Sequence, residues 1–317
     1  MKNMEDILVN MNRKESKACV DAVITSYNQK TMILEAVESL LNQTLLLQKI
    51  VIVDDGSTDE ESLCVLKKIE KDANMCIPIT IMYQENRGVS AARNVGIRNT
   101  ESPMVLVLDG DDRIEDTYVE CVVQLLNENS SMVAASSWMK TFGVLDAIVR
   151  PIGGNIVSFL YRNCCPATHI LCREVFEKCG GYDETMKSGF EDWDFFLNML
   201  EAMPNSIIGI VEKPLIQYRT NPASSNIKSM NKRIELMRYI IEKHINSYRD
   251  NITDALLEIE KISDTRLLQL EDEIIYSISN NQNMSQQAKL FIQNPSYGDG
   301  GMASAVRIVS NFKNELL

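Results

Sequence analysis

The chain has 317 residues, a formal net charge of −12, and 45% hydrophobic and 24% charged residues. This length accommodates one large α/β domain with an appended region, and the composition is ordinary for a globular protein. The acidic balance and the lack of a basic stripe argue against a nucleic-acid-binding protein. No stretch has the length of a transmembrane helix and no signal peptide is visible, so we expect a cytoplasmic protein without a transmembrane segment.

Polar and charged residues fill positions 1–17, where we expect an N-terminal lead-in. The eight cysteines lie mostly within apolar segments, and without a secretion signal we expect them to be reduced and buried. They are Cys19, Cys64, Cys76, Cys121, Cys164, Cys165, Cys172 and Cys179. A zinc site among the last four is disfavoured, because these cysteines lack paired C-x-x-C spacing.

Strand and helix patterns alternate in the first half of the chain. Short apolar runs predict strands at Val20 to Thr25, Lys49 to Val53, Ile79 to Tyr83, Met104 to Leu108 and Met132 to Trp138, and we expect the second and the fourth of these to be buried. Apolar residues at helical spacing predict helices around Ile33 to Leu41, Leu63 to Ile69, Gly88 to Arg98 and Tyr118 to Leu126. This alternation predicts a mostly parallel sheet with helices on both faces.

An acidic cluster follows the buried strand that ends at Leu108, where Asp109, Gly110, Asp111 and Asp112 succeed one another. Clustered carboxylates at the end of a buried strand repel each other and are partly desolvated, so they favour a bound cation. Oxygen ligands suit Mg²⁺ or Mn²⁺, which usually also bind substrate phosphates. The alternative is a solvated acidic turn that caps the next helix.

Polar clusters also follow two other predicted strands, at residues 25–27 and 54–55. Ligands of such sheets bind beyond the carboxyl ends of the strands, so we expect all three clusters at one rim. A carboxylate there can accept a hydrogen bond from a nucleobase imide, and Tyr27 can stack on the base. The segment from Asp54 to Asp59 also has the residues of a strand-to-helix turn with a helix cap.

Two further motifs carry charged residues at predicted helix starts. Gly88 lies between Arg87 and Arg93 at a loop-to-helix junction, where free N–H groups favour an anion; surface salt bridges are the alternative for either arginine. Farther along, Glu191 and Asp192 are adjacent and flanked by aromatic residues. Partial desolvation would give Asp192 the raised pKa of a general base, whereas the alternative is an ordinary acidic helix N-terminus.

After Pro222 the composition shifts to charged helices with apolar faces, predicted at Lys228 to Arg249 and Ile252 to Ile278. A loop and a short helix follow from Pro295 onward. These apolar faces can cover the chain's own core, form a homo-oligomer or contact an acceptor. The tail is not distinctly basic, which makes a membrane-surface role the weaker interpretation.

Taken together, the ordered motifs resemble family 2 glycosyltransferases over residues 18 to 225. They are Thr25 to Asn28, Val53 to Asp59, Asn86 to Asn94, Leu108 to Asp112, and Gly180 to Glu184 leading into Glu191 and Asp192. The resemblance implies the GT-A glycosyltransferase fold, an α/β fold with a nucleotide-binding half (18–140) and an acceptor half (141–225). A helical C-terminal region (226–317) follows.

The resemblance also implies an inverting sugar transfer from a nucleotide-sugar, most often a UDP-sugar, to a glycan, lipid-linked or protein-linked acceptor. Peripheral association with the inner face of a membrane is compatible with such acceptors. The residues implied for donor binding are Thr25, Tyr27, Asp55, Arg87, Asp109 and Gly110. Asp109 and Asp111, with Asp112 beside them, match the family's Mn²⁺- or Mg²⁺-binding motif. Asp192 matches its general base. Glu191, Trp193 and His169 lie on the expected acceptor side, although His169 is also readily explained as a satisfied structural histidine.

One position departs from the family pattern: Asn221 and Pro222 follow Tyr218 and Arg219, where the family often has a histidine near the diphosphate or metal. This departure motivates a second hypothesis, a non-catalytic homologue that binds a nucleotide-sugar or glycan as a partner or scaffold. A third hypothesis, nucleotidyl transfer, requires a glycine- and lysine-rich phosphate loop that residues 26–30 do not supply.

Overall fold

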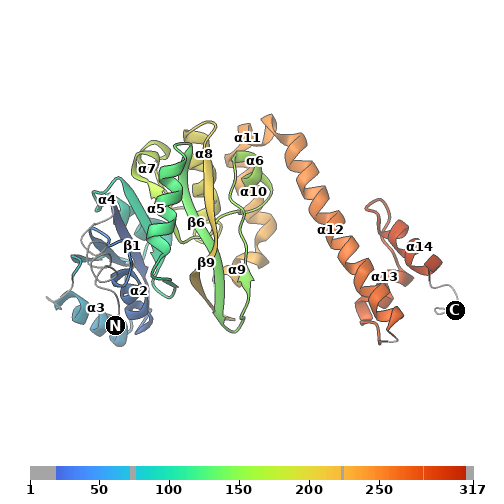
Figure 1. The fold of residues 1–317 in the computed structure, drawn as a ribbon, viewed down its shortest axis with the longest axis horizontal. Helices are drawn as coiled ribbons and strands as arrows, with labels where there is room; N and C mark the ends of the chain where they lie inside the picture. The colour runs from blue at the N-terminus through green and yellow to red at the C-terminus, as the bar shows by residue number, and fades with distance from the viewer. Residues whose placement is uncertain (1–18, 72–75, 223–224, 281, 312–317) are drawn as a thin grey trace, which may run out of the picture. The chain divides into compact units, whose positions relative to one another are not determined.

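A computed structural model of the chain describes residues 19–71, 76–222, 225–280 and 282–311. The chain divides into two compact units, one that ends at Asp250 and one that begins at Asn251 (Figure 1). Within the described ranges, none of the helices combines the length and the apolar character needed to cross a membrane.

One mixed sheet forms the centre of the first unit, with strand order β3-β2-β1-β4-β8-β6-β9-β5 and with β7 paired to β6. The strands are β1 (Val20–Ser26), β2 (Ile50–Asp54), β3 (Ile79–Tyr83), β4 (Met104–Asp109), β5 (Arg113–Ile114), β6 (Met132–Gly143), β7 (Ile148–Val149), β8 (His169–Cys172) and β9 (Ile207–Thr220).

The helices of the first unit connect these strands and continue beyond β9. They are α2 (Met32–Leu41), α3 (Glu60–Lys71), α4 (Val89–Arg98), α5 (Tyr118–Glu128), α6 (Ile156–Tyr161), α7 (Arg173–Cys179), α8 (Glu191–Ala202), α9 (Ser225–Asn231), α10 (Arg233–Lys243) and α11 (Ile245–Asp250).

The nucleotide-binding half follows the predicted pattern, because β1, β2, β3 and β4 are parallel. Alternate side chains of β1 point to opposite faces of the sheet. Ala22 and Ile24 join the core formed with α2, α3 and α5. Val23 lies under α4, where a Cβ on Gly96 would come within 2.2 Å of it. Glycine at position 96 therefore allows α4 to pack directly on the strand.

The acceptor half changes strand direction. The short strand β8 is antiparallel to both β4 and β6, whereas β6 and β9 pair in parallel over a long register that contains bulges. In Figure 1 α5 lies alongside these two long strands, and its residues contact both. Of the five predicted strands, four are β1 to β4 and the fifth is the first part of β6. The sequence pattern did not predict β8, the antiparallel strand between β4 and β6.

All eight cysteines are free thiols, and two of them, Cys164 and Cys165, are buried as predicted. The prediction of burial is wrong for Cys19, Cys64 and Cys76, which are exposed. Cys64 lies on the outward face of α3, because Val65 and Leu66 take the inward positions of that helix.

The helix predicted from Lys228 to Arg249 is divided into α9, α10 and α11. Charged side chains attach this segment to α8. Lys243 donates to the fully buried Asp194 at 2.8 Å, and His244 contacts Asp194 at 3.0 Å and Glu201 at 2.9 Å. These helices belong to the first compact unit, and the functional division predicted at residue 226 stays a prediction.

His244→Gln should reduce the melting temperature more at about pH 6 than at about pH 9. Burial alone would lower the pKa of His244, but the hydrogen bonds to Asp194 and Glu201 raise that pKa above its ordinary value. The protonated histidine therefore stabilises the fold below its unfolded-state pKa, and this contribution is lost as the pH rises through the folded-state pKa. Thermal melts of the wild type and of the exposed control Asn246→Ala provide the comparison. An equal loss at both pH values would contradict the prediction.

The second unit, described by itself, contains α12 (Ile252–Ser279), α13 (Gln286–Gln293) and α14 (Gly301–Asn311). Ile274, Ile278 and Ile308 form its core with Ala288. The predicted helix from Ile252 is confirmed, and the oligomeric role of this region stays a prediction.

Candidate active site

Strand register brings the predicted polar clusters together at the carboxyl ends of three parallel strands. Thr25 at the end of β1 is opposite Asp109 of β4, and Ser26 is opposite Asp54 of β2. The convergence predicted from the topology is therefore confirmed at the level of the backbone. Gly110 lies against β1, where a Cβ would come within 2.7 Å of the Thr25 carbonyl oxygen.

Asp109 is held by a buried arginine. Both carboxylate oxygens of Asp109 accept from Arg93, at 2.9 and 3.1 Å, and Oδ1 also accepts from the Thr25 hydroxyl at 3.0 Å. Arg93 is buried, so it does not form the surface salt bridge considered as its alternative, and its partners are instead carboxylates inside the protein. Asp109 is thus fixed in place, and its oxygens are partly occupied.

Asp111 and Asp112 lie in the turn after β4. Burial and the nearby Asp109 raise the pKa of Asp111 to about 6. Burial and Asp111 raise the pKa of Asp112 well above its ordinary value, although Asp112 accepts from the Arg219 backbone N–H at 2.7 Å. Burial is the main cause of both raised pKa values, and the positive charge of the nearby Arg219 offsets them only in part.

Residues outside the predicted site support this acidic turn. Arg219 donates from Nε to the Asp111 carbonyl oxygen at 2.9 Å and from Nη2 to Glu35 at 2.9 Å. Arg113 donates to the same carboxylate at 2.9 Å, and both guanidinium groups lie over the Phe142 ring. In the sequence, Arg219 is notable only because it precedes Asn221, and Glu35 is one charged residue of a predicted helix.

Asp55 organises the loop that leads into α4. Its carboxylate accepts from the backbone N–H groups of Arg87 and Gly88, each at 2.8 Å, and from the Gln84 side chain at 2.7 Å. The Arg87 side chain pairs with Glu184, which is the alternative considered for it. The Tyr27 side chain is half-exposed beside this rim, as a stacking platform requires.

Asp192 lies in the first turn of α8. Its carboxylate accepts from the Trp193 backbone N–H at 2.8 Å and from the Asn163 side chain at 3.0 Å. Burial, and then the neighbouring Glu191, raise the pKa of Asp192 to about 7. A carboxylate with this pKa is well matched to proton abstraction near neutral pH.

The acidic turn and the start of α8 share one site. Arg93 contacts Asp109 at 2.9 Å and Glu191 at 3.1 Å. Burial raises the pKa of the Tyr218 phenol above its ordinary value. The negative charges of the four aspartates predicted to bind the metal or to act as the base raise that pKa further. These aspartates are Asp109, Asp111, Asp112 and Asp192.

Two residues predicted on the acceptor side lie below the surface of the site. Trp193 is buried, and its indole N–H donates to the Phe159 carbonyl oxygen at 2.6 Å. His169 is fully buried, its Nδ1 lies 2.7 Å from the Ala167 carbonyl oxygen, and burial lowers its pKa to about 3. Both side chains pack in the interior. His169 differs from the satisfied structural histidine considered as its alternative, because its buried Nε2 has no hydrogen-bond partner within the described residues. Glu191 is the third predicted residue and binds Arg93.

The residues fit a divalent cation that is shared with a phosphate ligand. No three acidic, histidine or cysteine side chains in the described ranges are arranged to bind a metal by themselves. Asp111 forms no ion pair within the same ranges, in contrast to Asp109. Mg²⁺ and Mn²⁺ sites commonly use one or two carboxylates together with substrate phosphates, which matches this donor set.

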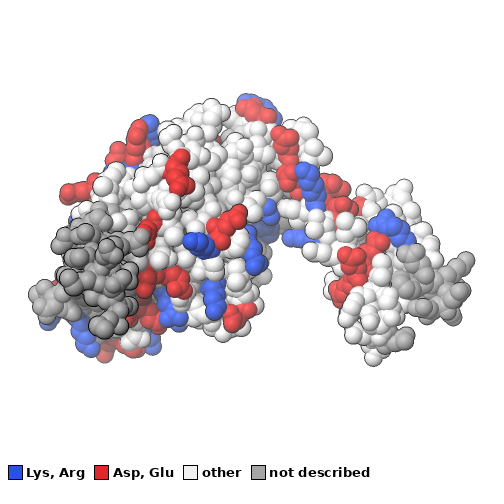
Figure 2. Space-filling model, in the orientation of Figure 1, with Lys and Arg blue, Asp and Glu red and all other residues white. Residues whose placement is uncertain are grey.

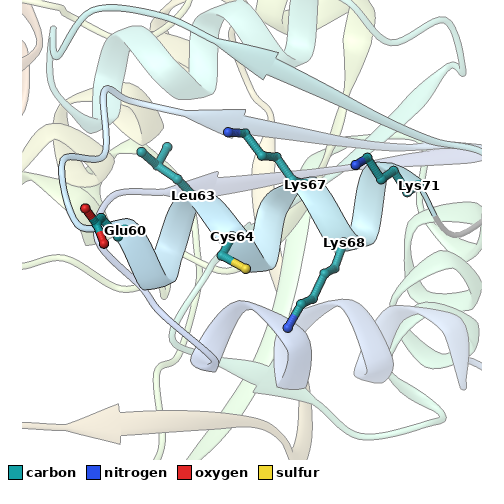
Figure 3. Close-up of a pocket in the computed structure, with 6 residues that line it drawn as sticks. All are labelled: Glu60, Leu63, Cys64, Lys67, Lys68 and Lys71. Carbon is teal, nitrogen blue, oxygen red and sulfur yellow. The ribbon is translucent and has the colours of Figure 1, made fainter.

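The surface shows mixed charges and a pocket along α3 that does not include the residues of this site. Figure 2 shows acidic and basic side chains interspersed among uncharged residues on the face in view. A surface pocket of about 390 Å³ follows α3 and is lined by residues of that helix alone (Figure 3). Its lining contains none of the residues predicted for donor, metal or acceptor binding. The lining residues are Glu60, Leu63, Cys64, Lys67, Lys68 and Lys71.

Comparison with known families agrees with the motif order and the geometry. A family model described as "Glycosyl transferase family 2" matches residues 21–180, which is half of the chain. The chain belongs to glycosyltransferase family 2. The predicted family is thus confirmed.

Relatives with glycosyltransferase names match most of the chain. An uncharacterized glycosyltransferase of Rickettsia felis is 27% identical over 266 residues, covering 80% of this chain and 42% of the relative. Glycosyltransferase GlyA of Streptococcus pneumoniae is 24% identical over 318 residues, covering 88% of this chain and 44% of the relative. The chain therefore spans less than half the length of these two proteins.

Among solved structures, S. aureus TarS 1–349 in complex with UDP-GlcNAc aligns with a TM-score of 0.60 at 15% identity. The alignment covers 94% of this chain and 81% of the TarS chain. Similarity at this level of identity establishes the fold, and the predicted GT-A glycosyltransferase architecture is confirmed.

Proposed function

We propose that this glycosyltransferase moves a sugar from a UDP-sugar to a hydroxyl group of a glycan, lipid-linked or protein-linked acceptor, with inversion at the anomeric carbon. The observation that carries the proposal is the Asp109–Arg93–Glu191 bridge, which joins the acidic strand end to the start of α8. UDP and UDP-GlcNAc are bound by the structurally similar TarS, which supports a UDP-sugar as the donor.

Asp192 acts in this proposal as the general base. In a single displacement, the acceptor oxygen attacks the anomeric carbon from the face opposite the nucleotide, and the base removes the proton of the acceptor hydroxyl. The Asn163 amide and the Trp193 N–H hold one carboxylate oxygen each, so the carboxylate has a fixed orientation. Its raised pKa keeps the carboxylate basic enough to accept a proton near neutral pH.

The donor occupies the rim formed by the strand ends. Tyr27 stacks on the base, and Asp55 accepts a hydrogen bond from the uracil imide N–H. Arg87, in the loop that leads into α4, contributes a further contact to the nucleotide. Asp111 is the first candidate ligand for Mn²⁺ or Mg²⁺, with Asp109 and Asp112 beside it. Such an ion, when bound, stabilises the charge that develops on the departing diphosphate. Asn221 follows β9 directly and lies two residues after Arg219, whose backbone N–H binds Asp112.

A panel of nucleotide-sugars tests the proposal. We expect at least one UDP-sugar to raise the melting temperature more with Mn²⁺ than with EDTA, and to release UDP on turnover. GDP- and dTDP-sugars at the same concentrations are the control for the base. Stabilisation by a UDP-sugar without any hydrolysis or transfer would support instead a non-catalytic homologue that acts as a partner or scaffold. A lack of any response to UDP-sugars would contradict the proposed transfer.

A further inference from the structure

Arg93 is among the most completely buried charged residues in the described part of the chain, with 1% of its surface exposed. It extends from α4, and its guanidinium group contacts Asp109 of β4 and Glu191 of α8. The same group lies 5.4 Å from the centre of the Tyr182 ring. Its Nε–H has no hydrogen-bond partner in the described residues.

These contacts connect segments that lie far apart in sequence. Asp109 ends a strand of the donor half, and Glu191 immediately precedes the proposed base, Asp192. Burying an ion pair costs desolvation energy that offsets much of its attraction, so such a bridge contributes little net stability. An N–H left unpaired adds to that cost. The arrangement is therefore better explained by the geometry that it imposes than by stability.

We propose that Arg93 is a positioning residue, which holds the first turn of helix α8 against the donor-side strand β4 and thereby sets the position of Asp192. The inference rests on the proposed role of Asp192 as general base. Arg93 acts through Glu191 and Asp109 and has no direct hydrogen bond to Asp192.

Several charged and titratable groups surround Asp192. Glu191 and Asp109 disfavour its ionised form, and Arg93 is the cation among the groups that influence it. Three further titratable groups interact electrostatically with Asp192. They are Tyr218 of β9, Cys165 and Tyr182. Loss of Arg93 therefore favours the protonated, inactive form of the base, and loss of the Glu191 charge favours the ionised form.

Arg93→Met tests the inference in the full chain, with the UDP-sugar that gives the highest turnover as substrate and UDP as the binding probe. We expect kcat to fall by about 10²-fold, because misplacement of the base by about 1 Å has an effect of this size, while the dissociation constant of UDP changes by less than about threefold. Arg93→Lys should recover part of kcat, since a lysine binds one carboxylate but does not bridge two. Arg98→Met, at an exposed position of the same helix, is the matched control and should leave kcat unchanged.

The pH profile of kcat/KM separates positioning of the base from general structural damage. In Arg93→Met the acid limb should move to higher pH by about one unit, and in Glu191→Gln it should move to lower pH. A folded Arg93→Met protein with wild-type kcat, or with an unmoved acid limb, would overturn the inference. If Arg93→Met does not fold, Glu191→Gln decides alone, and an unmoved limb overturns the inference.

Asp192→Asn, measured in parallel, distinguishes this inference from the function on which it rests. If Asp192→Asn retains wild-type turnover, both the base assignment and the role of Arg93 are overturned. If Asp192→Asn is inactive and Arg93→Met behaves like the wild type, only the role of Arg93 is overturned.

Discussion

Replacement of Asp192 by asparagine is expected to lower kcat by about 10³-fold, within the range that a general base contributes. Asparagine keeps the shape of the side chain and can still accept from Trp193 or Asn163, but it cannot take a proton from the acceptor hydroxyl. The dissociation constant of UDP should change by less than about threefold, because the carboxylate is proposed to act on the acceptor and not on the nucleotide.

Two measurements together check this prediction: UDP release with a preferred UDP-sugar, and calorimetric titration with UDP. Asp146→Asn, at an exposed position after β6, is the matched control for the chemical change. Equal losses of UDP affinity and kcat in Asp192→Asn would indicate damage to the donor site. Undiminished turnover would remove Asp192 as the base.

Much of the nucleotide-binding half could be predicted because its signals are local. The strand from Met104 is apolar without interruption to Leu108, and the strand from Val20 is buried along its whole length although it contains Asp21. The helices that follow have one apolar face each. Alternation of the two patterns determines parallel strands, and the shared direction of the strands places their polar ends at one rim.

The acceptor half was predicted less completely because its structure depends on pairing over long sequence separations. The antiparallel strand β8 has only four residues, too few for a period to be recognised. The register between β6 and β9 contains shifts near Trp138, and this register brings Arg219 close to the acidic turn. No local pattern indicates such a contact.

Site residues show the same division. Residue type and position after a strand led to the predictions for Asp55 and Asp111, and position at a helix start among aromatic residues led to the prediction for Asp192. The partners of these groups, such as Arg93 beside Asp109, depend on tertiary packing. The two residues Glu191 and Trp193 belong to one sequence motif but differ in the structure. Trp193 packs in the interior, whereas Glu191 binds Arg93 at the site.

Asp111→Asn is expected to remove most of the effect of Mn²⁺ on activity and to lower kcat by roughly 10²- to 10³-fold, as the loss of a charge-stabilising group does. Asp111 is the acidic residue of the turn without an ion pair or a hydrogen bond to another described backbone group, and the pKa of its carboxyl is raised because burial and Asp109 oppose its charge. A divalent cation relieves this repulsion, so the neutral amide should bind the cation far more weakly.

Asp112→Asn is the matched comparison, because Asp112 is buried, accepts from the Arg219 N–H, and has a pKa raised well above its ordinary value. An amide there keeps the hydrogen bond and resembles the protonated acid, so the expected loss of Mn²⁺ dependence is much smaller. Titration of UDP-bound protein with Mn²⁺, followed by turnover at saturating Mn²⁺, measures both effects. If the two variants lose Mn²⁺ dependence equally, the cation is shared by both carboxylates, and the assignment of Asp111 as its principal ligand is wrong.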